Sequence, residues 1–190
     1  MKKLIWAKTI FESYKYLSRI IKSIDRLVLE RSVNSYNVSV GEITTLEKME
    51  AVIDLIQRKK RLLVIKMLVE ESLKNIDKES ARILIKYYID KIDMTTIAQN
   101  YGTNRRAMAR KVNKLLQMCM EKMYDLGYNI RMIENLLENE GWIIGIYNSY
   151  VAKLPASAEI QEIALPPLRG MEKVFYNYCN RMSRGESCST

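Results

Sequence analysis

The sequence has no histidine and only seven glycines and three prolines in 190 residues. Without histidine the chain cannot form a His–Cys zinc site, a Ser–His or Cys–His relay, or an imidazole acid–base catalyst. The three cysteines (Cys119, Cys179 and Cys188) show no CxxC spacing, which argues against a zinc knuckle or a disulfide framework and fits a reducing cytoplasm. We therefore expect a cytoplasmic protein with no metal site and no cofactor.

Other absences narrow the function further. No uncharged apolar run approaches the roughly 18 residues of a membrane helix, so we expect no membrane partner. The phosphate-binding, nucleophile-elbow and zinc-protease motifs GxxxxGK[ST], GxGxxG, GxSxG and HExxH are all missing. Paired carboxylates such as Glu138 and Glu140 read as solvated faces. The sequence thus predicts no catalytic residues and no enzyme.

Basic residues are abundant but unevenly spread. The chain carries 31 Lys and Arg against 22 Asp and Glu, a net charge of +9. Residues 1–75 hold 15 basic and 9 acidic side chains, residues 76–127 hold 10 and 6, and residues 128–190 hold 6 and 7. A polyanionic partner is therefore expected to meet the first two segments rather than the last.

Few glycines and prolines, with helical periodicity, predict an all-α fold. Residues 1–75 predict a long antiparallel helical hairpin. The first helix, about 5–31, carries a stripe spaced 4, 3, 4, 3, 4: Ile10, Tyr14, Leu17, Ile21, Ile24 and Val28. The second, from a capping box at Thr44–Glu47 to about Asn75, carries Leu46, Met49, Ile53, Ile56, Leu63 and Met67, with Lys60 interrupting. We expect the two stripes to pack together; the alternative is that the hairpin also forms a homodimer.

Shorter helices are expected after the hairpin. Asp77 can cap a helix to about Lys91, followed by helices at about 95–100 and 104–126, the latter ended by Gly127. Residues 128–190 predict a smaller helical extension. It comprises a helix over 128–140 closed by Gly141, a helix or apolar strap over 142–153, a proline-containing linker over 153–167 and a last helix over 171–182.

The segment 95–112, TTIAQNYGTNRRAMARKV, has the pattern of a helix-turn-helix. Ala98 allows close approach of the two helices, Gly102 suits a turn with positive φ, and Ile97 can fill the core. Thr103 or Asn104 can cap the second helix. Its inner face would hold Met108, Val112, Leu115 and Cys119. No Asp or Glu occurs from Met94 to Met120, whereas five basic residues do.

The stretch from Asp77 through Ile97-Ala98 to Leu116 resembles region 4 of bacterial sigma factors and is similar to phage regulators of the RinA and ArpU type. The resemblance implies a recognition helix over 104–118 in the DNA major groove, and RNA polymerase as a further partner. The residues expected to meet DNA are Thr103, Asn104, Arg105, Arg106, Ala109, Arg110, Asn113 and Lys114. Lys111 departs from the family pattern, since it stands in a slot that is usually apolar, and Val112 takes its place.

Two further basic segments indicate function less strongly. Arg58–Arg61 would be a solvated band or a supplementary phosphate contact. Trp6, with Lys2, Lys3 and Lys8, would lie in a frayed terminus or on a membrane or nucleic acid.

The leading hypothesis is a DNA-binding transcriptional regulator, expected to be a homodimer on double-stranded DNA. One alternative is a phage DNA-packaging subunit of the small terminase kind, although its helix-turn-helix usually comes first. The other is a helical adaptor or inhibitor that does not read DNA, which the hairpin and the tyrosine-rich C-terminal third favour.

Overall fold

The computed structural model describes residues 2–34 and 45–154, and every regular element within them is helical. The helices are α1 (Lys2–Asn34), α2 (Thr45–Lys74), α3 (Lys78–Leu84), the π-helix η1 (Ile85–Ile89), α4 (Met94–Asn100), α5 (Arg105–Asp125), α6 (Ile130–Leu137) and α7 (Gly141–Val151). The predicted all-α class is confirmed for this part of the chain. Thr44, the linker from 155 onward and the helix at 171–182 lie outside it. None of the described helices is both long and apolar enough to cross a membrane.

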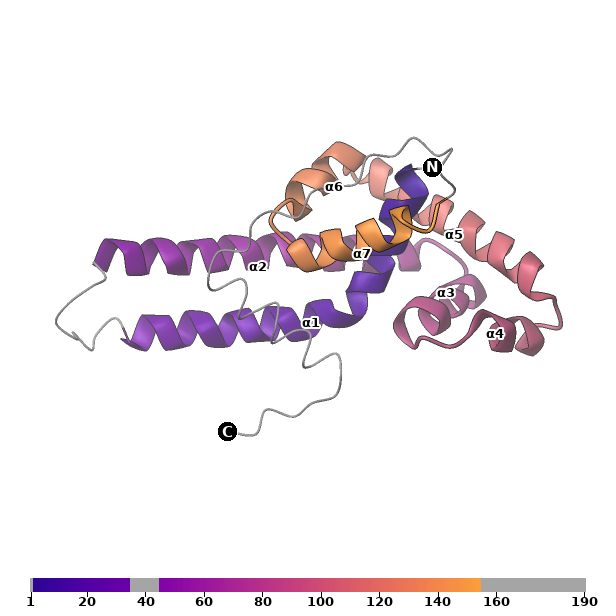
Figure 1. The fold of residues 1–190 in the computed structure, drawn as a ribbon, viewed down its shortest axis with the longest axis horizontal. Helices are drawn as coiled ribbons and strands as arrows, with labels where there is room; N and C mark the ends of the chain where they lie inside the picture. The colour runs from indigo at the N-terminus through magenta and orange to yellow at the C-terminus, as the bar shows by residue number, and fades with distance from the viewer. Residues whose placement is uncertain (1, 35–44, 155–190) are drawn as a thin grey trace.

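α1 and α2 lie side by side along the long axis of the molecule, and the shorter helices gather around one end of the pair (Figure 1). At that end α1 is buried on several sides: Trp6, Ala7, Ile10 and Phe11 are almost fully enclosed by α5, α7 and η1 as well as α2. One hydrophobic core therefore includes residues from 1–75, 76–127 and 128–154. The boundaries at 75 and 127 mark stretches of sequence rather than separately packed units.

The prediction of which face of α2 packs on α1 is wrong. Leu46, Met49, Ile53, Ile56, Leu63 and Met67 were expected to pack on α1, yet all six are exposed. α2 instead buries a second apolar set, Leu55, Leu62, Ile65, Leu68 and Val69. Because apolar side chains occupy two sides of this helix, periodicity alone does not identify the side that meets the core.

The residues predicted to begin or end a helix do so at most helix ends. Asp77 accepts from the Ser80 amide at 2.8 Å, and Gly127, with φ of 90°, follows the end of α5. Two expectations differ. The helix expected to reach Lys91 passes into η1, and Lys91 has φ of 59°. Gly141, expected to close a helix over 128–140, is the first residue of α7.

Buried carboxylates fasten α6 and α7 to the rest of the core. Glu140 has no exposed surface and holds Arg58 through two hydrogen bonds, from Nε at 2.7 Å and from Nη2 at 2.8 Å. Glu140 also accepts from Trp142 Nε1 at 3.0 Å. The interpretation of Glu140 as solvated is therefore wrong, because a long-range partner from α2 compensates its burial.

Trp6 corrects another expectation. Its ring stacks on Tyr147 with centroids 4.4 Å apart, and its Nε1 donates to Glu134 at 3.0 Å. Lys2 pairs with the same carboxylate at 2.7 Å. Trp6 thus belongs to the core, where α1 meets α6 and α7, and lies neither in a frayed terminus nor on a surface that could meet a membrane.

Candidate nucleic-acid interface

α4 and α5 are joined by a tight turn. Ile97 and Ala98 on α4 are buried, and Gly102 has φ of 59°. The Gly102 amide donates to Gln99 at 3.0 Å and the Thr103 amide donates to Ala98 at 2.9 Å. A Cβ added at Gly102 would meet no atom within 4 Å, so the requirement there is the left-handed backbone rather than space.

The inner face of α5 fixes its rotation. Met108, Val112, Leu115 and Cys119 are buried, as expected from their spacing. Lys111 is exposed while Val112 is only 2% exposed. The departure from the sigma-like pattern therefore leaves the basic face pointing outward, with Val112 providing the apolar contact. Burial also raises the pKa of the Cys119 thiol to about 12, so this thiol is neutral at physiological pH.

The residues expected to contact DNA fall into two groups according to their exposure. Asn104, Arg105, Arg106, Arg110 and Lys114 are exposed, whereas Thr103, Ala109 and Asn113 are half-buried. Asn104 also caps α5, because its Oδ1 accepts from the Ala107 amide at 2.7 Å. Its side-chain oxygen is therefore already used, and only the amide nitrogen remains to face a ligand.

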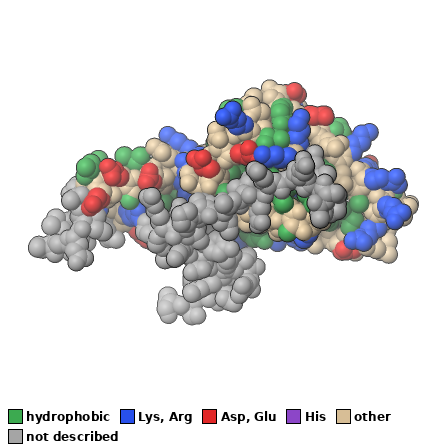
Figure 2. All heavy atoms as spheres, turned by 45° about the horizontal axis from the view of Figure 1, so that its top comes forward, with side chains coloured by type: hydrophobic (Ala, Val, Ile, Leu, Met, Phe, Trp, Pro, Cys, Tyr) green, Lys and Arg blue, Asp and Glu red, His purple; other side chains and the backbone are tan. Residues whose placement is uncertain are grey.

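Arg106, Arg110 and Lys114 form one line of charge. They recur at every fourth residue, so they share a face of α5 over about 12 Å. None of the ion pairs among the described residues includes any of the three. Figure 2 shows Lys and Arg side chains (blue) gathered at the right-hand end of the molecule, where Figure 1 places the α4–α5 turn.

The start of α5 adds to this positive charge. Arg105 and Arg106 occupy its first turn, which contains no acidic residue. Amide groups at a helix N-terminus already carry partial positive charge, so two arginines there are unfavourable unless an anion binds. The helix end and the arginines together favour a phosphate or another anion.

Sequence reasoning missed part of this surface. The ammonium groups of Lys86 and Lys111 lie 6.0 Å and 5.8 Å from the centre of the Tyr101 ring. Lys86 comes from η1, so the basic surface continues beyond α5. Lys111 could have been found as part of the acid-free stretch, but Lys86 lies outside that stretch among apolar and tyrosine residues and gave no signal. The exposed polar residues of α4, Thr95, Thr96, Gln99 and Asn100, were missed too.

Comparison with known proteins adds no match: neither protein-family models, nor curated proteins, nor solved structures resemble this chain detectably.

Proposed function

We propose that this protein is a sequence-specific DNA-binding transcriptional regulator that inserts α5 into the major groove. The observation that carries the proposal is the line Arg106, Arg110 and Lys114, which has no acidic partner among the described residues. Like charges four residues apart destabilise a helix by about 0.2–0.5 kcal/mol per pair. Duplex phosphates would offset that repulsion, and counterion release would add affinity.

In this proposal the basic residues have two roles. Arg105, Lys111 and Lys114 contact phosphates and set the position of α5 on the duplex. Arg106 and Arg110 read guanine edges through bidentate hydrogen bonds, and Asn113 can contact adenine. α4 would cross the backbone with its exposed threonines and amides. The sigma-like resemblance adds RNA polymerase as a proposed second partner.

The test begins with selection of bound fragments from genomic DNA, followed by a salt titration on the recovered site. The variant carries Arg106→Ala and Arg110→Ala together. If both side chains read guanine edges, affinity for the selected site falls by about 1–3 kcal/mol for each side chain removed, and the preference over other sequences weakens. Lys22→Ala with Arg26→Ala is the matched control, because both residues are exposed on α1 and remove the same charge. Unchanged affinity and unchanged sequence preference in the first variant would show that the assignment is wrong.

A second candidate function is a helical adaptor that does not read DNA. The exposed apolar side chains of α2 favour it, since such a surface fits another protein better than a nucleic acid. A protein that retains no genomic fragment above background, yet forms a stoichiometric complex with another protein, would support the adaptor over the regulator.

A further inference from the structure

The outer side of α2 carries a regular apolar stripe. Its members are 39–66% exposed and are spaced 3, 4, 3, 7 and 4 residues apart: Leu46, Met49, Ile53, Ile56, Leu63 and Met67. Lys60 fills the one empty slot, so the heptad pattern is unbroken over 46–67. The core contacts of α2 come from other residues, chiefly Leu62, Ile65 and Leu68. Soluble monomers rarely expose an ordered apolar surface of this extent.

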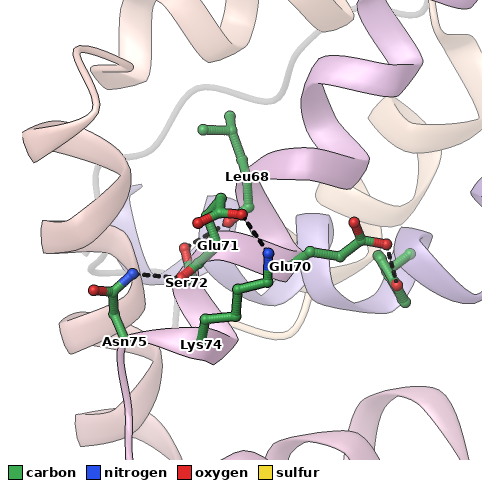
Figure 3. A network of polar contacts seen from close by, with 7 residues as sticks. Leu68, Glu70, Glu71, Ser72, Lys74 and Asn75 are labelled. Atoms are coloured by element: carbon green, nitrogen blue, oxygen red, sulfur yellow. Dashed lines mark hydrogen bonds and ion pairs between the residues drawn. The ribbon is translucent and has the colours of Figure 1, made fainter.

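The stripe has a clear end. The next two heptad slots are Glu70 and Lys74, both polar. Figure 3 shows them among the polar contacts that finish α2: Glu70 accepts from Tyr14 at 2.9 Å, and Lys74 pairs with Glu71 at 2.7 Å. From Leu46 to Met67 the stripe spans about 32 Å of helix. Figure 2 shows hydrophobic side chains (green) with acidic ones (red) at the left-hand end, where Figure 1 shows α2 beginning.

A stripe with heptad spacing fits another helix of the same spacing, because its side chains interlock as knobs into holes. A second copy of α2 provides such a helix. The described chain leaves the core at Leu154, near α1 residue Glu12, which accepts from Tyr150. In Figure 1 α7 lies toward the end of the α1–α2 pair that is farther from the start of α2. A second copy of α2 carries the same stripe over its full length, so two copies can cover each other from Leu46 to Met67.

Electrostatic interactions favour an antiparallel orientation of the two α2 helices. Lys60 lies within the stripe, and a parallel pair would place the two Lys60 ammonium groups side by side. An antiparallel pair centred on Ile56 separates them by about 12 Å along the helix axis. It also brings each Lys60 near the exposed carboxylate of Glu50 of the second copy, and neither residue is in an ion pair among the described residues. A single lysine in a heptad core is a known determinant of helix pairing.

We propose that the α2 stripe is a homodimer surface, on which two copies of α2 pack antiparallel about a two-fold axis near Ile56. The proposal does not depend on DNA binding, and every test below is made without nucleic acid. Failure of the dimer and failure of the proposed regulator function can therefore be told apart.

Sedimentation velocity over a range of concentrations tests the surface. Ile56→Asp places two carboxylates against each other at the axis, and we expect at least a tenfold weaker dimer. Lys60→Leu should strengthen the dimer, a gain that damage to the fold cannot produce. Met132→Asp is the matched control, because Met132 is a 45% exposed apolar residue on α6 and not a member of the stripe. Circular dichroism checks that all variants keep the same helix content.

Disulfide trapping tests the orientation in a chain with Cys179→Ser and Cys188→Ser; Cys119 is buried and stays reduced. In the antiparallel pair Ile56→Cys should cross-link with itself, because it lies on the axis. Met67→Cys alone should not, whereas a mixture of Leu46→Cys and Met67→Cys chains should. Efficient cross-linking of Met67→Cys with itself would indicate a parallel pair and overturn the orientation.

Two other results would overturn the proposal entirely. One is a chain that stays monomeric at all concentrations. The other is a dimer whose affinity is unchanged by both Ile56→Asp and Lys60→Leu. Hydrogen exchange tells whether residues of the same chain cover the stripe. If the protein is a monomer, and Ile56→Asp lowers exchange protection within 155–190, residues of its own chain occupy the stripe and the second copy does not.

Discussion

Two segments look alike in the sequence and differ in the folded molecule. One segment is the run Arg58-Lys59-Lys60-Arg61 on α2, and the other is the set Arg105, Arg106, Arg110 and Lys114 on α5. Both are basic and helical. On α2, Arg58 is held by the buried Glu140, and Lys59 pairs with Asp25 of α1. On α5, none of the four basic side chains is in an ion pair among the described residues.

The difference comes from the neighbouring elements rather than from the basic residues themselves. α2 packs beside α1, and α7 begins next to it, so carboxylates from both reach its cations. None of the described helices covers the exposed basic residues of α5, and the sequence of α5 lacks acids up to Glu121. The interpretation of 58–61 as a solvated band is therefore wrong for Arg58 and Lys59. A basic run indicates a polyanionic partner only where the fold leaves it without carboxylates.

Breaking the buried pair should give the largest effect. Glu140→Ala leaves the Arg58 guanidinium, whose side chain is only 15% exposed, without its carboxylate. We expect a loss of about 3–5 kcal/mol in the free energy of unfolding, measured by urea denaturation. Glu138→Ala, an exposed neighbour, should change it by less than about 0.5 kcal/mol.

A double variant sharpens this prediction. Arg58→Met with Glu140→Leu removes both charges and should recover most of the loss, because the penalty comes from separating a buried charge from its carboxylate. Equal losses for Glu140→Ala and Glu138→Ala would mean that the pair contributes no more than a surface contact.

Local signals account for what the sequence predicted well. The cap at Asp77, the turn at Gly102, the Asn104 cap and the inward positions Met108 and Val112 all depend on residues within one or two helical turns of each other. Short spacings determine these features, so they can be read before any tertiary structure is known.

Long-range contacts account for what it missed. The partner of Glu140 lies 82 residues away, and that of Trp6 lies 128 residues away. The buried side of α2 is likewise chosen by α1, α5 and α3 together, since α2 offers two apolar sides. No spacing rule within one helix contains this information. Lys86 joined the candidate interface for the same reason, because only the fold brings η1 to Tyr101.

Lowering the pH should reduce the free energy of unfolding through Glu12, by less than the loss of the Arg58–Glu140 pair does. Burial would raise the pKa of Glu12, but hydrogen bonds from Lys91 and Tyr150 outweigh it and lower the pKa below its usual 4.5. The stabilisation from Glu12 is therefore complete above pH 4.5 and is lost as the pH falls through the lowered value. Urea denaturation from pH 6 to pH 3 should show this loss, and Glu12→Gln should make the curve shallower.

Between pH 6 and 8 the same measurements should stay nearly level, because the chain has no histidine. For the same reason DNA affinity should also change little from pH 6 to 8. A steep change of stability in this window would point to a titrating group outside the ion pairs described above.

The smallest expected effect has the opposite sign. Arg110 lies between Arg106 and Lys114, so Arg110→Gln removes two repulsive pairs at once. The free energy of unfolding should rise by a few tenths of a kcal/mol, as measured by urea denaturation, whereas DNA affinity should fall. Arg58→Gln, the same substitution on α2, should lower stability by more than 1 kcal/mol because it breaks a buried pair. A positively charged side chain that weakens its own fold while strengthening DNA binding is positioned for a partner. If Arg110→Gln instead lowers stability as Arg58→Gln does, the α5 charges are structural and the comparison between the two segments fails.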